Sequence, residues 1–141
     1  MYEPIRNASP RRSLHTLADP GDFPHRSREE ELDIQLAGHL AALLAVTDEL
    51  RALTPDGDGD LDAAADSLAH QVARLRGGAT PVRSAVTAAI HEPHAAALHQ
   101  RAHALAGRAL VVAASRADTA AAILAARRME AHASAARLVS A

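Results

Sequence analysis

Apolar residues recur at intervals of three and four along most of this chain, a spacing that places them on one face of an α-helix. The first series follows Ser27 and Glu30, which form the S-x-x-E pattern of a helix N-terminus. We predict a helix that begins at Ser27 and ends at Thr54-Pro55. Its apolar positions are Leu32, Leu36, His39, Leu43, Val46, Leu50 and Leu53.

A second series with the same spacing lies between Asp60, the expected N-cap, and Gly77-Gly78, which should stop the helix. Its members are Leu61, Ala65, Leu68, Val72 and Leu75. Because only a short acidic linker separates the first two helices, we expect them to form an antiparallel hairpin.

A third helix is expected to begin at Thr80 and Pro81, which suit an N-cap and the first helical position. Pro93 should kink this helix or break it. The inner face before the proline consists of Val82, Val86 and Ile90. After it, the pattern resumes with Leu98, Ala102, Leu105, Ala109 and Val112.

The end of the third helix carries no glycine or proline, so two arrangements stay open. Ser115-x-x-Asp118 resembles a capping box, and we favour a tight turn near residues 114–118. A fourth helix would then carry its apolar residues at Ile123, Leu124, Met129 and Leu138. The alternative is one straight helix over 94–139, which would be about 70 Å long and would force oligomerisation.

Together these patterns predict an all-α fold, a four-helix up-down bundle over residues 29–141 with a Pro-kinked third helix. Residues 1–28 contain four prolines and five arginines without any sustained period, so we expect a flexible, disordered tail. No apolar run reaches the length of a membrane span, and the first residues lack the apolar segment of a signal peptide. We therefore expect a cytoplasmic protein that makes no membrane contact.

Composition qualifies this picture, because alanine occupies 36 of the 141 positions and the aromatics are Tyr2 and Phe23 alone. Alanine favours helices but buries little area, so the core should be aliphatic and modest. Close helix packing or self-association would compensate, and we predict a homo-oligomer, in the simplest case a homodimer. All fifteen basic residues are arginine, which fits the coding bias of a GC-rich bacterium.

Charge is distributed unevenly, although the net charge is only −2. Residues 29–62 carry a net charge of −9, whereas residues 63–141 carry +5. We expect the acidic first part to lie against the basic second half, within one chain or between two.

The strongest candidate for chemistry is a histidine cluster, in which His99 and His103 stand four residues apart on one helical face. Two such imidazoles can share a transition metal such as Zn. A third ligand must come from another helix, and His132 is the best candidate because it lies near the level of His99. Further candidates are His39, His70 and Glu130. The glutamate of the metalloprotease motif is missing, so we favour a partly exposed polar face and keep metal binding as the alternative.

Several other chemistries are excluded or disfavoured. The lack of cysteine removes disulfides, thiolate metal sites and cysteine nucleophiles. No nucleophile elbow, P-loop or dinucleotide-binding motif is present, so we predict no enzymatic activity and no catalytic residue. Arg101, Arg108 and Arg116 recur about every two turns like a phosphate-binding stripe. We nevertheless do not expect nucleic-acid binding, because the net charge is negative and the helices carry no aromatic residue.

Three functional hypotheses remain, and the sequence names no ligand, partner or pathway. The first is a non-enzymatic, homo-oligomeric regulatory or scaffold protein that acts through protein–protein contacts of its tail or of a bundle face. The second is a transition-metal-binding bundle that uses His99, His103 and His132. The third is an arginine-mediated binder of nucleic acid or phosphate.

Overall fold

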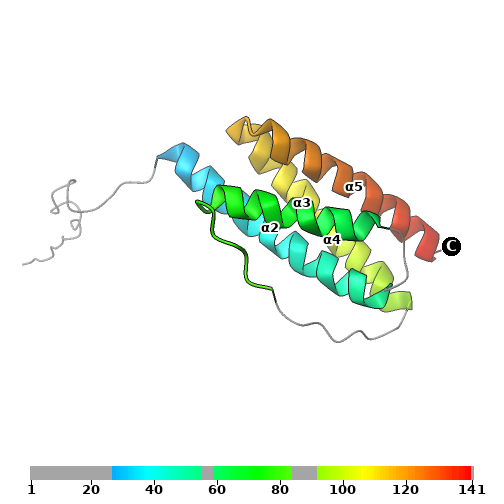
Figure 1. The fold of residues 1–141 in the computed structure, drawn as a ribbon. Coiled ribbons are helices and arrows are strands. Elements are labelled where there is room, and N and C mark those ends of the chain that lie inside the picture. Colours follow the sequence, from blue (N-terminus) through cyan, green and yellow to red (C-terminus); the bar gives the residue numbers. More distant parts are fainter. Residues whose placement is uncertain (1–26, 55–58, 84–91, 141) are drawn as a thin grey trace, which may run out of the picture.

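The computed structural model describes residues 27–54, 59–83 and 92–140, which form four α-helices and no strand (Figure 1). The all-α fold expected from the sequence is confirmed. The predicted tail of residues 1–28 lies almost wholly outside the described residues. Within the described ranges, none of the helices has both the length and the apolar character needed to cross a membrane. The helices are α2 (Arg28–Leu53), α3 (Asp60–Leu75), α4 (Glu92–Arg116) and α5 (Thr119–Ser140).

Helix α2 begins and ends where its sequence predicts. Ser27 and Glu30 form the reciprocal capping box: the Glu30 amide donates to Ser27 Oγ over 3.1 Å, and the Ser27 amide donates to Glu30 Oε1 over 2.8 Å. Thr54 is the C-cap, one residue before Pro55. The two bonds satisfy amides that the first helical turn would otherwise leave unpaired.

Helix α3 starts differently from the prediction and ends as predicted. Gly59, and not Asp60, is the N-cap, and it provides no side-chain hydrogen bond. Asp60 is instead the first helical residue, which leaves its carboxylate available to another helix. At the other end, Gly77 has φ 69°, and the Gly78 amide donates to the carbonyl of Ala73 over 2.7 Å. This is the glycine-terminated stop that the sequence predicts.

The predicted start of the third helix is wrong. Residues 79–83 are not helical, and Val82, expected on an inner face, is 96% exposed. Val86 and Ile90 lie outside the described residues. Helix α4 begins at Glu92, so Pro93 belongs to its first turn. A proline there loses no helical hydrogen bond, so the described part of α4 gives no evidence for the predicted kink.

A tight turn separates α4 from α5, as favoured above, and the single long helix is ruled out. Ala117 has φ 59°, and the Asp118 amide donates to the carbonyl of Ala113 over 2.8 Å. Asp118 then caps α5, because its Oδ1 accepts from the amide of Ala121 over 3.2 Å. Ser115 is not part of a capping box, since its hydroxyl donates to the carbonyl of Val111 within α4.

The order of the helices differs from the up-down arrangement that the sequence analysis expects. Helices α2 and α5 run one way along the bundle, and α3 and α4 run the other way (Figure 1). Helix α2 packs against α3 and α4, α5 packs against α4, and α3 meets α5 only lightly. The parallel helices α3 and α4 therefore occupy opposite corners. The connection over 76–91 permits this, since sixteen residues can extend over roughly 50 Å and α3 is about 24 Å long.

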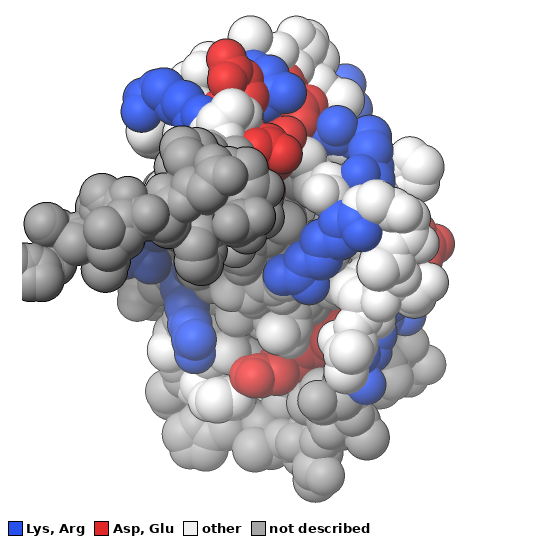
Figure 2. Space-filling model, turned by 90° about the vertical axis from the view of Figure 1, so that its left-hand side faces the viewer, with Lys and Arg blue, Asp and Glu red and all other residues white. Residues whose placement is uncertain are grey.

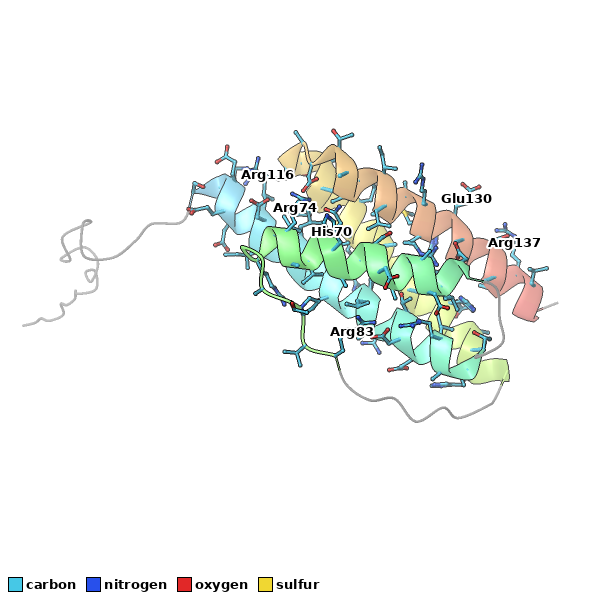
Figure 3. The ribbon with its side chains drawn as sticks, in the orientation of Figure 1. His70, Arg74, Arg83, Arg116, Glu130 and Arg137 are labelled. Carbon is cyan, nitrogen blue, oxygen red and sulfur yellow. The ribbon has the colours of Figure 1, made fainter. Side chains whose placement is uncertain are left out.

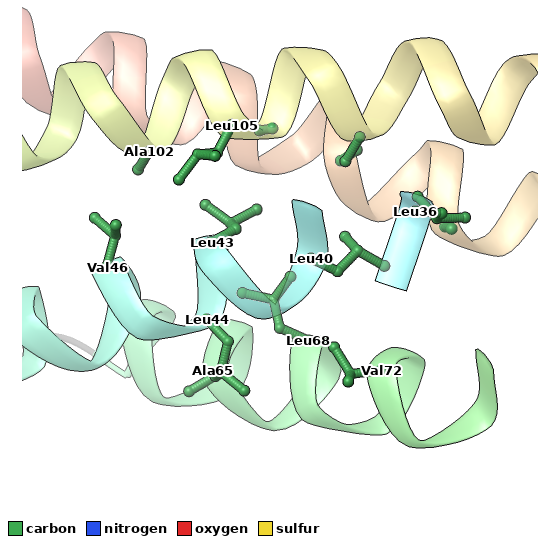
Figure 4. Close-up of a cluster of buried hydrophobic side chains, with 14 of the residues drawn as sticks. Leu36, Leu40, Leu43, Leu44, Val46, Ala65, Leu68, Val72, Ala102 and Leu105 are labelled. Carbon is green, nitrogen blue, oxygen red and sulfur yellow. The ribbon is translucent and has the colours of Figure 1, made fainter. Parts of the chain in front are cut away.

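Helix α2 lies between its two neighbours and supplies most of the large leucines that are fully buried. Figure 4 shows Leu43 directed towards α4 near Leu105, and Leu44 directed towards α3 near Ala65. The apolar series predicted for α2 and α3 hold, because their central members are buried. The fully buried apolar side chains with the largest volumes are Leu36, Leu40, Leu43, Leu50, Leu68 and Val72.

Ion pairs connect the acidic first part of the chain to its basic second half, as expected, and they do so within one chain. Arg116 Nε donates to Asp33 Oδ1 over 3.0 Å, at the end of the bundle where α2 begins (Figure 3). Arg83 binds both carboxylate oxygens of Asp48 at 2.7 Å. Both acidic and basic side chains lie on the face shown in Figure 2.

Candidate anion-binding pocket

The fully buried face of α5 is built from small and polar residues, and of the four apolar residues selected from the sequence only Leu124 and Met129 pack, partly buried, against the core. Ile123 is 47% exposed and Leu138 is 78% exposed, so both lie on the outside. The buried positions follow one another in steps of four, three and four residues. They are Ala121, Ala125, Arg128 and His132. Two ionisable side chains thus occupy core positions, where a charged group is rare unless it is paired.

Arg128 is only 4% exposed, and its guanidinium joins α5 to α3. Its Nη1 donates to Asp60 Oδ2 at the start of α3 over 2.9 Å, and its Nη2 lies 3.3 Å from His132 Nε2. The remaining nitrogen, Nε, is shielded from solvent and has no hydrogen-bond partner among the described residues. An unpaired buried N–H is costly, so this nitrogen needs an explanation.

The contact between Arg128 and His132 fixes the protons of a histidine pair. A guanidinium can only donate, so His132 Nε2 accepts and the neutral ring carries its proton on Nδ1. That Nδ1 lies 3.0 Å from His99 Nδ1, which must therefore accept. His99 then carries its proton on Nε2. The rings are tilted by 41° with their centroids 5.3 Å apart.

Burial and charge keep both imidazoles neutral. Burial, and then the nearby charge of Arg128, lower the pKa of His132 from 6.5 to about 3. The same two causes, in the same order, lower the pKa of His99. Protonation of either ring would place two donors face to face and would remove an acceptor, so the hydrogen-bond chain from Arg128 requires the neutral forms.

The three histidines proposed as metal ligands are hydrogen-bonded to other groups of the protein. His99 and His132 bind each other, whereas His103 donates from Nδ1 to the carbonyl of Met129 over 3.0 Å. In the part of the chain that the structure describes, no group of three histidine or carboxylate side chains is placed to hold a metal ion. Metal binding by His99, His103 and His132 stays a prediction.

A pocket of about 340 Å³ opens beside these residues, between the second half of α5, the start of α3 and the first half of α4. Arg128, His132, His99 and Asp60 form its polar part. Its apolar wall includes Leu61, Ala135 and Leu138. The pocket lies at the loosest contact of the bundle, where α3 meets α5 only lightly. A small molecule could therefore enter here without opening the leucine core.

Sequence reasoning found the histidines and missed the charged pair that organises them. Arg128 is not among the candidates selected from the sequence, and Asp60 is expected only as an N-cap. The available signal was the spacing, because Arg128 and His132 continue the four-three-four series of Ala121 and Ala125. A series of small residues that ends in two polar ones is easily overlooked when branched residues are taken as the marker of a buried face.

Comparisons with protein-family models, with curated proteins and with solved structures found no match to this chain. Arguments about function therefore rest on the geometry of the pocket.

Proposed function

We propose that this protein binds a small anionic ligand, with Arg128 as the anchoring group. The observation that carries the proposal is a buried guanidinium, 4% exposed, whose Nε has no hydrogen-bond partner among the described residues and which lines an open pocket. A planar guanidinium with unused N–H groups is the usual protein partner for carboxylate and phosphate oxygens.

A purely structural role explains Arg128 less well. One ion pair with Asp60 would join α3 to α5, but the Asp60 side chain is 58% exposed, and an ion pair with an exposed partner contributes little to stability. The same helix contact could be made by apolar side chains without burying a charge. A ligand that uses the unpaired N–H gives the buried guanidinium a function that compensates for its cost.

Binding is favoured over catalysis because the two histidines that line the pocket, His99 and His132, have no unoccupied basic nitrogen for a substrate. His132 uses both ring nitrogens in hydrogen bonds, and His99 Nδ1 accepts from it. A general base needs an unoccupied nitrogen within reach of the proton that it removes. The proposal therefore agrees with the expectation of a non-enzymatic protein.

The test is a titration of the full-length protein, followed through the Nε–H signals of its arginines by NMR. Acetate, octanoate, octyl phosphate and inorganic phosphate serve as probes. We expect at least one probe to bind with a Kd below about 1 mM and to shift the Arg128 signal. The variant Arg128→Leu should lose this binding. Arg127→Leu is the matched control, because Arg127 is the exposed neighbour on the same helix.

The proposal fails if no probe shifts the Arg128 signal, or if the two arginine variants bind equally well. Arg128→Lys provides a second variant should Arg128→Leu not fold, because it keeps the charge and removes the planar group. We expect it to weaken binding by about tenfold or more, since lysine cannot make the two-pronged contact.

Self-association is a second candidate, and one surface feature favours it. The turn between α4 and α5 is flanked by an open apolar groove of about 280 Å³ that includes Ala113, Ala122 and Ile123. Alanine-lined helix faces allow a second helix to approach closely. A second copy of the chain seated there would bury Ile123. Light scattering at tens of micromolar should show a dimer that Ile123→Glu converts to a monomer, and a monomeric wild type would contradict it.

A further inference from the structure

Building on the proposed anion site, we infer that its ligand is a monocarboxylic acid with a short aliphatic body, and that its carboxylate displaces Asp60 from Arg128. The inference rests on the proposed function and adds the ligand class and the mode of entry. Three properties of the pocket carry it: its charge balance, the exposure of Asp60 and its apolar wall.

The charge balance of the pocket favours a single negative charge. Arg128 is the one cation in the pocket lining, because the hydrogen-bond chain holds His132 and His99 neutral. Asp60 already provides one negative charge against it at 2.9 Å. A carboxylate can replace Asp60 without changing the net charge. A phosphate monoester carries up to two charges, and the second would enter a partly buried site without a counterion.

Asp60 is suited to being displaced. Its side chain is 58% exposed while that of Arg128 is 5% exposed, so the aspartate lies on the solvent side of the guanidinium, where an incoming anion can compete with it. Its place at the first residue of α3 lets it remain favourable to the helix dipole after it leaves Arg128. With Asp60 turned aside, a ligand carboxylate can accept from Nη1 in its place.

The apolar wall sets the size and character of the rest of the ligand. Leu61, Ala135 and Leu138 line the pocket, and Leu138 is 78% exposed at its edge. An aliphatic chain lying on these residues would cover Leu138 and add apolar burial to the ion pair. The volume of about 340 Å³ is in the range of pockets that hold small molecules, so a short aliphatic chain fits beside the carboxylate.

The ligand class is tested by calorimetric titration of the full-length protein with octanoate, octyl phosphate, octanol and acetate. Octanoate should bind most tightly. Octyl phosphate keeps the chain and adds charge, octanol removes the charge, and acetate removes the chain. We expect each of the three to bind about tenfold more weakly than octanoate or worse.

Displacement is tested with Asp60→Asn, and Asp62→Asn serves as control because it lies two residues away and binds Arg51 instead of Arg128. If the ligand competes with Asp60, removing the competing charge should tighten octanoate binding by about two- to fivefold, the size expected for losing a partly exposed ion pair. The control should bind octanoate like the wild type.

The outcomes distinguish a wrong ligand class from a wrong anion site. Tighter binding of octyl phosphate than of octanoate overturns the ligand class and leaves the anion site intact. Octanol binding as tightly as octanoate, or no binding by any probe, overturns both. Equal affinity of Asp60→Asn and the wild type, with octanoate still the preferred probe, overturns displacement alone.

Discussion

The bundle consists of two helical hairpins whose interiors are filled by different side chains. The leucine hairpin, α2 with α3, fills its interior with residues such as Leu40, Leu43 and Leu68, each fully buried. The alanine hairpin, α4 with α5, buries mainly alanines together with Arg128 and His132. Its buried alanines are Ala102, Ala106, Ala109, Ala113, Ala121 and Ala125.

The difference shows how a modest core leaves room for a polar site. A buried leucine contributes about 1.5–3 kcal/mol, whereas alanine contributes much less and instead lets two helices approach closely. The leucine hairpin therefore supplies most of the hydrophobic stabilisation. The alanine hairpin can place a guanidinium and two imidazoles at its inner face because the main core does not depend on those positions. We therefore expect substitutions in the leucine hairpin to change mainly stability, and substitutions at the polar site of the alanine hairpin to change mainly binding.

The largest effect should follow from truncating the leucine hairpin. Leu43→Ala removes a fully buried side chain that faces α4, and we expect a loss of about 3 kcal/mol from the transfer and cavity terms together. Ile34→Ala, at a site on the same helix that is 49% exposed, should cost under about 1 kcal/mol. Urea unfolding monitored by circular dichroism measures both. Similar losses would mean that α2 does not carry the core.

The alanine hairpin should instead lose stability when its buried side chains are made larger. Ala109→Leu forces extra volume into a fully buried site and should cost about 2 kcal/mol. Ala104→Leu makes the same change at an exposed site of α4 and should be close to neutral. The same unfolding experiment applies. If Ala109→Leu stabilised the protein, the contact between α4 and α5 would be loose and the contrast between the hairpins would disappear.

Acid should weaken the alanine hairpin through its neutral histidines. Burial lowers the pKa of His132 to about 3, while the unfolded chain takes up the same proton near 6.5. Between these values the unfolded state binds more protons, so stability is complete above about pH 6.5 and falls as the pH drops towards 3. The slope should be about 1.4 kcal/mol per pH unit for His132, and His99 adds to it in the same direction.

His132→Gln separates this titration from that of other groups. Unfolding midpoints at pH 7, 6 and 5 should fall more steeply for the wild type than for the variant. Parallel slopes would show that His132 does not stay neutral in the folded protein.

The smallest effects are expected at the two turns that follow α3 and α4. Gly77 after α3 and Ala117 after α4 have almost the same left-handed backbone, with φ 69° and 59°. Ala117→Gly should therefore stabilise the protein by about 0.5–1 kcal/mol, because alanine is strained there and glycine is not. Gly77→Ala should cost about 1 kcal/mol through backbone strain alone, since a Cβ there would meet no atom within 4 Å. Thermal melts of the two variants should shift in opposite directions, and shifts of the same sign would contradict the comparison.

The sequence by itself determined the helices that local chemistry specifies. Ser27 and Glu30 define the start of α2, and Gly77 defines the end of α3, because capping needs only neighbours in the chain. The apolar series of α2 and α3 also indicated the buried face correctly. Where local signals were weak or ambiguous, the reading failed: Thr80-Pro81 looked like a helix start, although the described residues that follow are not helical.

The tertiary structure alone decided the order of the helices and the pocket. A sixteen-residue connection allows α4 to run parallel or antiparallel to α3, and no local rule selects between them. The buried face of α5 depends on the helices that it packs against. An alanine-rich helix has several faces of similar hydrophobicity. Packing against α4 and α3 buries the face that carries Arg128 and His132. His99 and Asp60 complete the pocket from other helices, and only the packing of the chain brings these distant residues within hydrogen-bonding distance.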